Sequence, residues 1–208
     1  MPGSIGIEET DIVALQLPRI LEDARFIEER LDSLIAQTDE DLERFQYAQD
    51  VLGGGRLEDD GDREKFAFAI VDSYRMDEVD LSLPGLEQLV ESGDLQLISN
   101  TETQEVLLSL INYRRSQDMV ITHLRQLFDH LATVVMTKTT FSIEPENSNH
   151  EAGANYRLIY DLAELQNDVN FKRAIGNLGM LHGYLRIRLV GYNERVARII
   201  EVLETNKP

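Results

Sequence analysis

The chain has 208 residues, of which 42% are hydrophobic and 28% are charged, and it contains no cysteine. This composition excludes a disordered chain, a disulfide framework and cysteine-based metal or catalytic sites. The 38 acidic residues outnumber the 20 basic ones and give a formal net charge of −18. Because such a field repels nucleic acids and anionic lipid headgroups, we expect no nucleic-acid binding.

The first predicted element is a long helix over residues 18–52. Pro18 suits the first turn of a helix, where its missing N–H costs nothing, and the glycine run at residues 53–55 is expected to end the helix. Apolar or small residues recur at steps of three or four, which is the spacing of one packed helix face. The predicted face consists of Ile20, Ala24, Ile27, Leu31, Leu34, Thr38, Leu42, Phe45, Ala48 and Leu52.

Two shorter helices are predicted next. One spans residues 62–76, and the other begins at Pro84. Gly93 is expected to end this second helix in the left-handed conformation. No stretch of the chain alternates between apolar and polar residues for long enough to predict a strand.

A second long helix is predicted to begin at residues 99–104, where two overlapping sequences fit a capping box, and to end at residues 138–141. A second apolar stripe on this helix, formed by Leu107, Ile111 and Ile121, would allow two copies to pair as a homodimer. The predicted buried face consists of Val106, Leu110, Tyr113, Gln117, Val120, Leu124, Leu127, Leu131 and Val134.

Residues 142–155 are predicted to form a mobile loop, because they contain a proline, a glycine and several asparagines. A helix over residues 156–165 follows, and a third long helix begins near residue 167 or 170. Its predicted face consists of Phe171, Ile175, Leu178, His182, Leu185, Leu189, Tyr192, Val196, Ile199 and Leu203.

These elements predict an all-α fold, an up-and-down helical bundle of about four helices, three of them long. We expect residues 18–208 to form a single domain. Residues 1–17 are interpreted as a leader, since the opening Met1-Pro2-Gly3-Ser4 is typical of a cloning remnant.

Gln117 and His182 are polar residues on two predicted buried faces. A buried histidine needs partners for its ring nitrogens, so the two side chains are candidates for one polar layer. One interpretation is a layer that senses pH or binds a ligand. The other, which we favour, is a polar pair that fixes the register of the helices.

The remaining charged motifs have ordinary structural interpretations. Residues 58–62 resemble part of a calcium-binding loop, but the positions that would open and close such a loop, Arg56 and Ala67, cannot ligate a cation. His123 and His130 lie seven residues apart, which is not the spacing of a zinc site on one helix, and we expect both to be partly exposed. The arginines in residues 184–198 lie among apolar residues on a helix, and we expect them either to snorkel to the surface or to pair with acidic neighbours. We therefore predict no catalytic, metal-binding or cofactor-binding residues.

Residues 83–100, Leu-Pro-Gly-Leu-Glu-Gln-Leu-Val-Glu-Ser-Gly-Asp-Leu-Gln-Leu-Ile-Ser-Asn, precede a helix that contains Tyr113 and Arg114. This arrangement resembles a family of small bacterial membrane-anchored proteins with a domain of unknown function. The helix that opens with Asn170-Phe171-Lys172-Arg173 is similar to the last helix of that family. The chain departs from the family pattern where Leu86 replaces an aromatic residue and where Arg114 replaces a second tyrosine. The resemblance implies a basic segment and one transmembrane helix ahead of an extracytoplasmic domain.

We therefore expect a non-enzymatic, extracytoplasmic (periplasmic) domain of a single-pass bacterial membrane protein. It would act as a sensing or protein-interaction module, with a protein partner or a second copy as its ligand, and would meet the membrane only through an N-terminal anchor. The alternative is a cytosolic helical adaptor that binds a partner helix. A hydrolase built from histidines and carboxylates in the bundle core is a third and weaker hypothesis.

Overall fold

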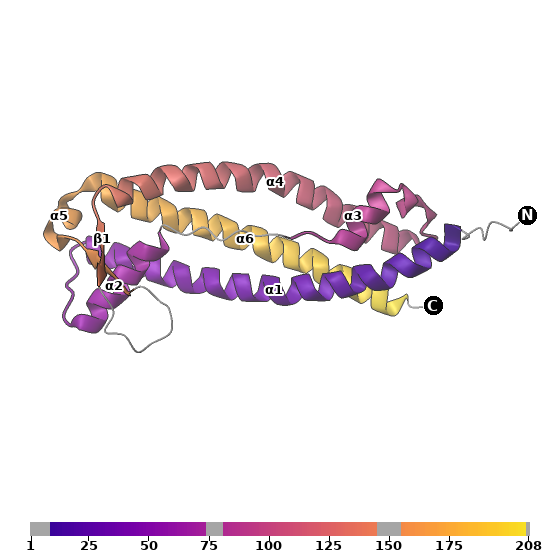
Figure 1. Cartoon of the computed structure of the whole chain (residues 1–208), viewed down its shortest axis with the longest axis horizontal. Helices are drawn as coiled ribbons and strands as arrows, with labels where there is room; N and C mark the ends of the chain where they lie inside the picture. Colours follow the sequence, from indigo (N-terminus) through magenta and orange to yellow (C-terminus); the bar gives the residue numbers. More distant parts are fainter. Residues whose placement is uncertain (1–8, 74–80, 145–154, 207–208) are drawn as a thin grey trace, which may run out of the picture. The chain divides into compact units, whose positions relative to one another are not determined.

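A computed structural model describes residues 9–73, 81–144 and 155–206 of the protein. These residues form an all-α bundle with three long helices of 44, 36 and 37 residues and one short β-hairpin (Figure 1). The elements in chain order are α1 (Glu9–Leu52), α2 (Asp60–Asp72), α3 (Pro84–Glu91), the 3-10 helix η1 (Asp94–Leu97), α4 (Thr101–Met136), β1 (Thr140–Glu144), β2 (Asn155–Ile159), α5 (Leu162–Asn167) and α6 (Val169–Thr205).

The residues group into two compact units. The first unit comprises residues 1–36, 78–120 and 187–208, and the second comprises residues 37–77 and 121–186. The three long helices each contribute a segment to both units. The short helix α3 belongs to the first unit, whereas α2, the hairpin and α5 belong to the second.

Within the first unit, α6 runs antiparallel to both other long helices. Glu204 pairs with Arg25 of α1, and Asn193 donates to Asp32 of the same helix at 2.8 Å. On the other side, Arg198 pairs with Glu102 near the start of α4, and the backbone carbonyl of Arg188 accepts from Tyr113. Within this unit, α1 and α4 therefore run parallel to each other.

Helix α1 begins nine residues earlier than expected, so the predicted leader at residues 1–17 is partly helical. Pro18 lies inside the helix. Proline removes one backbone hydrogen bond there, but residues 14–17 contain no serine, threonine, aspartate or asparagine that could cap a new helix start. The helix end was predicted correctly: Gly54, with φ 118°, follows the last turn.

The apolar pattern predicted the buried faces of α1 and α6 well. All ten predicted positions of α6 are buried, and eight of the ten on α1 are buried, with Leu34 and Leu42 half-buried. In the second half of α4 the prediction was wrong by one position: Leu127 is 40% exposed, whereas Phe128 and Val135 are buried. Two adjacent apolar stripes both satisfy the three-four spacing here, and the chain buries the one that holds the larger Phe128.

The predicted loop at 142–155 and the helix at 156–165 were also partly wrong. The flanks of the loop form an antiparallel hairpin in which Thr140 pairs with Ile159 and Glu144 with Asn155. Five-residue strands are too short for a clear alternation, which is why the pattern did not reveal them. Residues 145–154 of the predicted loop lie outside the described residues. Helix α5 starts at Leu162, because the Asp161 carboxylate accepts from the Glu164 N–H at 3.1 Å.

The end of α3 and the start of α4 can be compared with the predicted caps: the glycine cap is confirmed, and the capping boxes are not. Gly93 adopts the left-handed conformation (φ 79°) after α3, as predicted. Neither predicted capping box opens α4; instead Asn100 accepts from the Thr103 N–H at 2.9 Å. The predicted end of the second helix at residues 74–76 lies outside the described residues. Among the described helices, none is long and apolar enough to cross a membrane.

Candidate functional site

A groove in the first unit is the candidate functional site. Helices α3 and α4 form its two walls, α6 contributes Tyr192 between them, and it encloses about 240 Å³. Its lining consists of Leu83, Leu86, Glu87, Val90, Glu91, Leu110, Ile111, Arg114, Arg115 and Tyr192. Six of these ten residues carry apolar or aromatic side chains, so the interior of the groove is suited to an apolar group.

The α3 wall is held in place by a residue of α1. The Leu83 side chain at the N-cap position cannot accept a hydrogen bond, so the Asp23 carboxylate accepts from the Gly85 N–H at 2.9 Å instead. A Cβ atom on Gly85 would lie 3.1 Å from this carboxylate and 3.2 Å from Ile20. Glycine at this position therefore lets α3 start in close contact with α1.

An aromatic cluster lies behind the groove. Tyr192 is buried, and its hydroxyl donates to the Leu81 carbonyl at 2.9 Å. The Tyr113 ring lies 6.1 Å from it, and the Tyr113 hydroxyl donates to the Arg188 carbonyl at 3.1 Å. The Arg195 guanidinium stacks on Tyr113, 3.9 Å from the ring centre. These contacts fix the α6 side of the groove.

The rim of the groove carries opposite charges on its two walls. Residues 83–98 contain Glu87, Glu91 and Asp94 and no basic residue, whereas residues 107–117 of α4 contain Arg114 and Arg115 and no acidic residue. Glu87 and Arg114 form an ion pair between the walls. Glu91 and Arg115 are both exposed. The site thus combines an apolar interior with a polarised rim, which is an arrangement for binding.

The structure places the two predicted polar core residues in different units. Gln117, in the first unit, is 5% exposed; its amide nitrogen donates to the Ser116 hydroxyl at 3.0 Å, and its Oε1 is buried without a hydrogen-bond partner. His182, in the second unit, is also 5% exposed. Both residues are therefore buried, as the sequence predicted, but each has its own surroundings.

His182 lies among aromatic side chains. Its Nδ1 lies 3.0 Å from the Leu178 carbonyl of the preceding helical turn. The ring centres of Phe45 and Phe128, from α1 and α4, lie 4.8 and 5.9 Å away. No described carboxylate is placed against this ring. The imidazole fills space between three helices, which favours a packing role.

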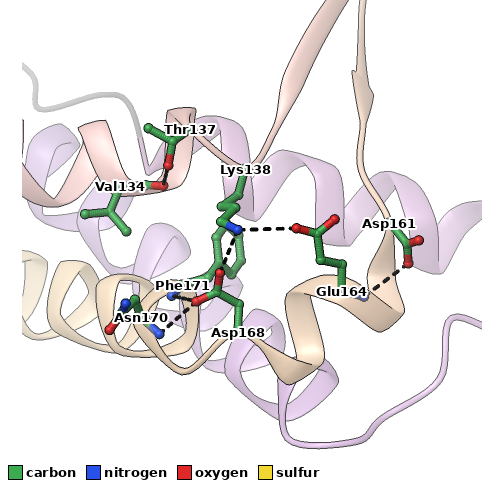
Figure 2. A network of polar contacts seen from close by, with 8 residues as sticks. All are labelled: Val134, Thr137, Lys138, Asp161, Glu164, Asp168, Asn170 and Phe171. Carbon is green, nitrogen blue, oxygen red and sulfur yellow. Dashed lines mark hydrogen bonds and ion pairs between the residues drawn. The ribbon is translucent and has the colours of Figure 1, made fainter.

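A polar network joins the end of α4 to α5 and α6 in the second unit (Figure 2). Lys138 lies 3.3 Å from Glu164 and 3.0 Å from Asp168. Asp168 also accepts from the N–H groups of Asn170 and Phe171 at 2.9 and 3.0 Å, so it caps α6. The Phe171 N–H and Lys138 hold the pKa of Asp168 below its ordinary range, and the two carboxylates raise the pKa of Lys138.

Gln166 adds a second connection in this unit. Its amide nitrogen donates to the Val51 carbonyl at 2.7 Å and to the Gly55 carbonyl at 2.9 Å. These carbonyls belong to the last turn of α1 and the chain that follows it. Because terminal helical carbonyls have no partner within the helix, Gln166 caps α1 from α5.

The other charged motifs take structural roles. Arg186 pairs with Asp39, which lowers the pKa of that carboxyl, and Arg198 pairs with Glu102 and Glu201, so the predicted ion pairing is confirmed for these two arginines. Arg195 instead stacks on Tyr113 and donates to the Gly191 carbonyl. In the calcium-loop-like segment, Asp59 caps α2 by accepting from the Asp62 N–H at 2.9 Å. Within the described parts of the chain, no cluster of three or more histidines and carboxylates could hold a metal.

The prediction for the two histidines is confirmed, whereas the prediction of a dimer stripe is not. His123 and His130 are exposed, as predicted. The stripe of Leu107, Ile111 and Ile121 is not a free second face, because Leu107 is fully buried and Ile111 lines the groove. The groove itself was not predicted from the sequence. Its only signal was the charge segregation between residues 83–98 and 107–117.

Comparisons with known proteins do not assign the chain to a family. No model of a protein family matches it, and neither a curated protein nor a solved structure shows significant similarity to it.

Proposed function

We propose that the protein is a non-enzymatic interaction module whose groove between α3 and α4 binds a short apolar segment of a partner protein. The observation that carries this proposal is the groove of about 240 Å³ with apolar walls, closed behind by Tyr192. A cavity of about 150 Å³ holds one benzene molecule, so this groove has room for a large apolar side chain or two smaller ones.

The length of the groove matches a helical ligand. Helix α3 has eight residues, which at about 1.5 Å per residue gives about two helical turns. Two anchors four residues apart on an amphipathic helix span about one turn and would both reach the groove. A partner segment of this kind fits the general arrangement better than a reacting substrate, because the rim charges at Glu87 and Arg114 already pair with each other.

We further propose that this module is the extracytoplasmic part of a single-pass bacterial membrane protein. Two features of the sequence support this location: the chain has no cysteine, and residues 83–114 resemble a membrane-anchored family. The full reading frame is the test. A transmembrane helix encoded ahead of this domain supports the proposal, whereas a reading frame without one favours the cytosolic adaptor, which would use the same groove.

Binding is tested with a synthetic amphipathic helical peptide that carries two leucines four residues apart. Fluorescence anisotropy measures its affinity for the wild-type protein and for Val90→Trp, in which an indole fills the groove. We expect saturable binding to the wild type and a loss of about tenfold or more in Val90→Trp, since the anchors lose their space.

Leu108→Trp is the matched control. Leu108 is on α4, is 40% exposed and does not line the groove, so the same bulky side chain there leaves binding unchanged. Equal affinity for the wild type and Val90→Trp would show that the peptide binds elsewhere and would end the proposal. Absence of saturable binding would do the same.

A further inference from the structure

The two walls of the groove carry charges of opposite sign. The α3 side contributes Glu87 and Glu91, and the α4 side contributes Arg114 and Arg115. The two central charges, Glu87 and Arg114, neutralise each other. Glu91 and Arg115 remain on opposite walls, both lining the groove and both exposed.

From this arrangement we infer that the partner segment is a bipolar amphipathic helix. It carries basic residues on the flank that lies over α3, acidic residues on the flank that lies over α4, and apolar anchors between them. This inference rests on the proposed function, because it specifies the ligand of the same groove. The polarity of the rim also fixes the direction in which the helix lies.

Charge complementarity at the rim provides direction and specificity more than affinity. Exposed ion pairs contribute little individually, and two of them change a dissociation constant by about threefold to tenfold. A helix placed in the reverse direction would bring its acidic flank against Glu91 and its basic flank against Arg115. Both contacts would then be repulsive, so the two directions differ by more than the gain from either pair alone.

The first measurement compares two peptides with the same pair of leucine anchors and no net charge. One carries lysines on one flank and glutamates on the other, and the second carries glutamines on both flanks. Because neither peptide has a net charge, general attraction to the acidic protein is the same for both. We expect the bipolar peptide to bind about fivefold more tightly at low salt, and we expect the difference to shrink as salt is added.

The second measurement removes the rim charges from the protein. Glu91→Gln combined with Arg115→Gln leaves the net charge unchanged and is expected to abolish the preference for the bipolar peptide. Glu29→Gln combined with Arg30→Gln, two exposed positions on α1 of the same unit, is the matched control and is expected to preserve it.

A third measurement reads direction. A spin label at the amino end of the peptide broadens the NMR signals of nearby amides, and exchanging the lysine and glutamate flanks is expected to move this broadening to the opposite end of α3. The inference is overturned if the bipolar and glutamine peptides bind equally well, or if both flank arrangements lie in the same direction. In those cases the proposed function stands, since both peptides still bind. If neither peptide binds, the proposed function fails as well.

Discussion

The groove of the first unit and the Lys138 network of the second unit each lie between helices, but their polar groups differ in how far they are paired within the protein. In the network, Lys138 has two carboxylates, and Asp168 has two N–H donors besides Lys138 (Figure 2). In the same unit, Gln166 donates to two backbone carbonyls. In the groove, apolar walls enclose unfilled space, and Glu91 and Arg115 face outward at its rim.

This difference indicates which region stabilises the fold and which is suited to bind. A polar cluster whose members are all satisfied by one another gains little from a ligand, because each new contact must replace an existing one. Apolar surface around an open space gains when it is covered, since water leaves it. Helices α4 and α6 thus take part in a structural junction in one unit and line the proposed binding groove in the other.

The largest effect is expected behind the groove, where the aromatic cluster leaves no space at Gly191. A Cβ atom there would lie 2.7 Å from the Tyr113 hydroxyl oxygen. Gly191→Ala is therefore expected to lower the free energy of unfolding by about 2 to 3 kcal/mol. In a Tyr113→Phe background, which lacks that oxygen, the same substitution should cost much less. Urea unfolding of the four variants measures the coupling, and an equal cost in both backgrounds would contradict the close packing of α4 on α6.

In the second unit, substitutions of Gln166 test whether its hydrogen bonds to the end of α1 stabilise the fold. Gln166→Glu places a carboxylate against the Val51 and Gly55 carbonyls and is expected to cost about 2 kcal/mol, because both donors are lost and the charge is repelled. Gln166→Ala removes only the donors and should cost about 1 kcal/mol. Thermal unfolding distinguishes the two. If both substitutions are neutral, α5 does not cap α1.

Asp23 connects stability to the groove, because it caps α3 from α1. Asp23→Ala is expected to lower the free energy of unfolding by about 1 kcal/mol and to weaken peptide binding, since the α3 wall loses its fixed start. Asp23→Asn keeps an acceptor for the Gly85 N–H and should preserve both properties. Anisotropy and urea unfolding of the pair measure this. If Asp23→Asn loses peptide binding as Asp23→Ala does, binding requires the charge of Asp23 and not the cap of α3.

A substitution of Gln117 is expected to raise the free energy of unfolding, whereas the substitutions above lower it. Its Oε1 is buried without a hydrogen-bond partner, so Gln117→Leu removes an unsatisfied acceptor and should raise the free energy of unfolding by up to about 1 kcal/mol. Gln126→Leu, at an exposed position of the same helix, is the control and should have almost no effect. Destabilisation by Gln117→Leu would indicate that the amide has a required polar partner.

The smallest effect concerns the charge of Asp168. Its pKa in the folded protein lies below the ordinary value of 3.8, so the carboxylate stabilises the fold above that pH, and the contribution is lost as the pH falls through the lowered pKa. Asp168→Asn keeps the cap but removes the charge. The wild type should therefore be the more stable at about pH 7, and the difference should shrink as the pH falls below the ordinary value of 3.8. A difference that grows on acidification would contradict the role of Lys138.

The spacing of apolar residues was sufficient to predict the all-α fold, the presence of three long helices and ten buried positions of α6. It was insufficient on α4, where Leu127 and Phe128 belong to adjacent stripes with the same spacing and only tertiary packing selects one. The short strands β1 and β2 gave too little alternation to detect. Among the site residues, Asp23 and Gln166 could not be predicted, because their partners lie 62 and more than 100 residues away in the chain.

Hydrogen exchange of the two regions in one sample tests whether the groove, and not the Lys138 network, is the surface that a partner covers. Backbone amides of α3 (Pro84–Glu91) and α5 (Leu162–Asn167) are compared with and without a saturating amount of the bipolar leucine peptide. We expect slower exchange in α3 and unchanged exchange in α5, because the peptide covers the groove and not the Lys138 network. Unchanged exchange in α3, or equal protection of α5, would contradict it.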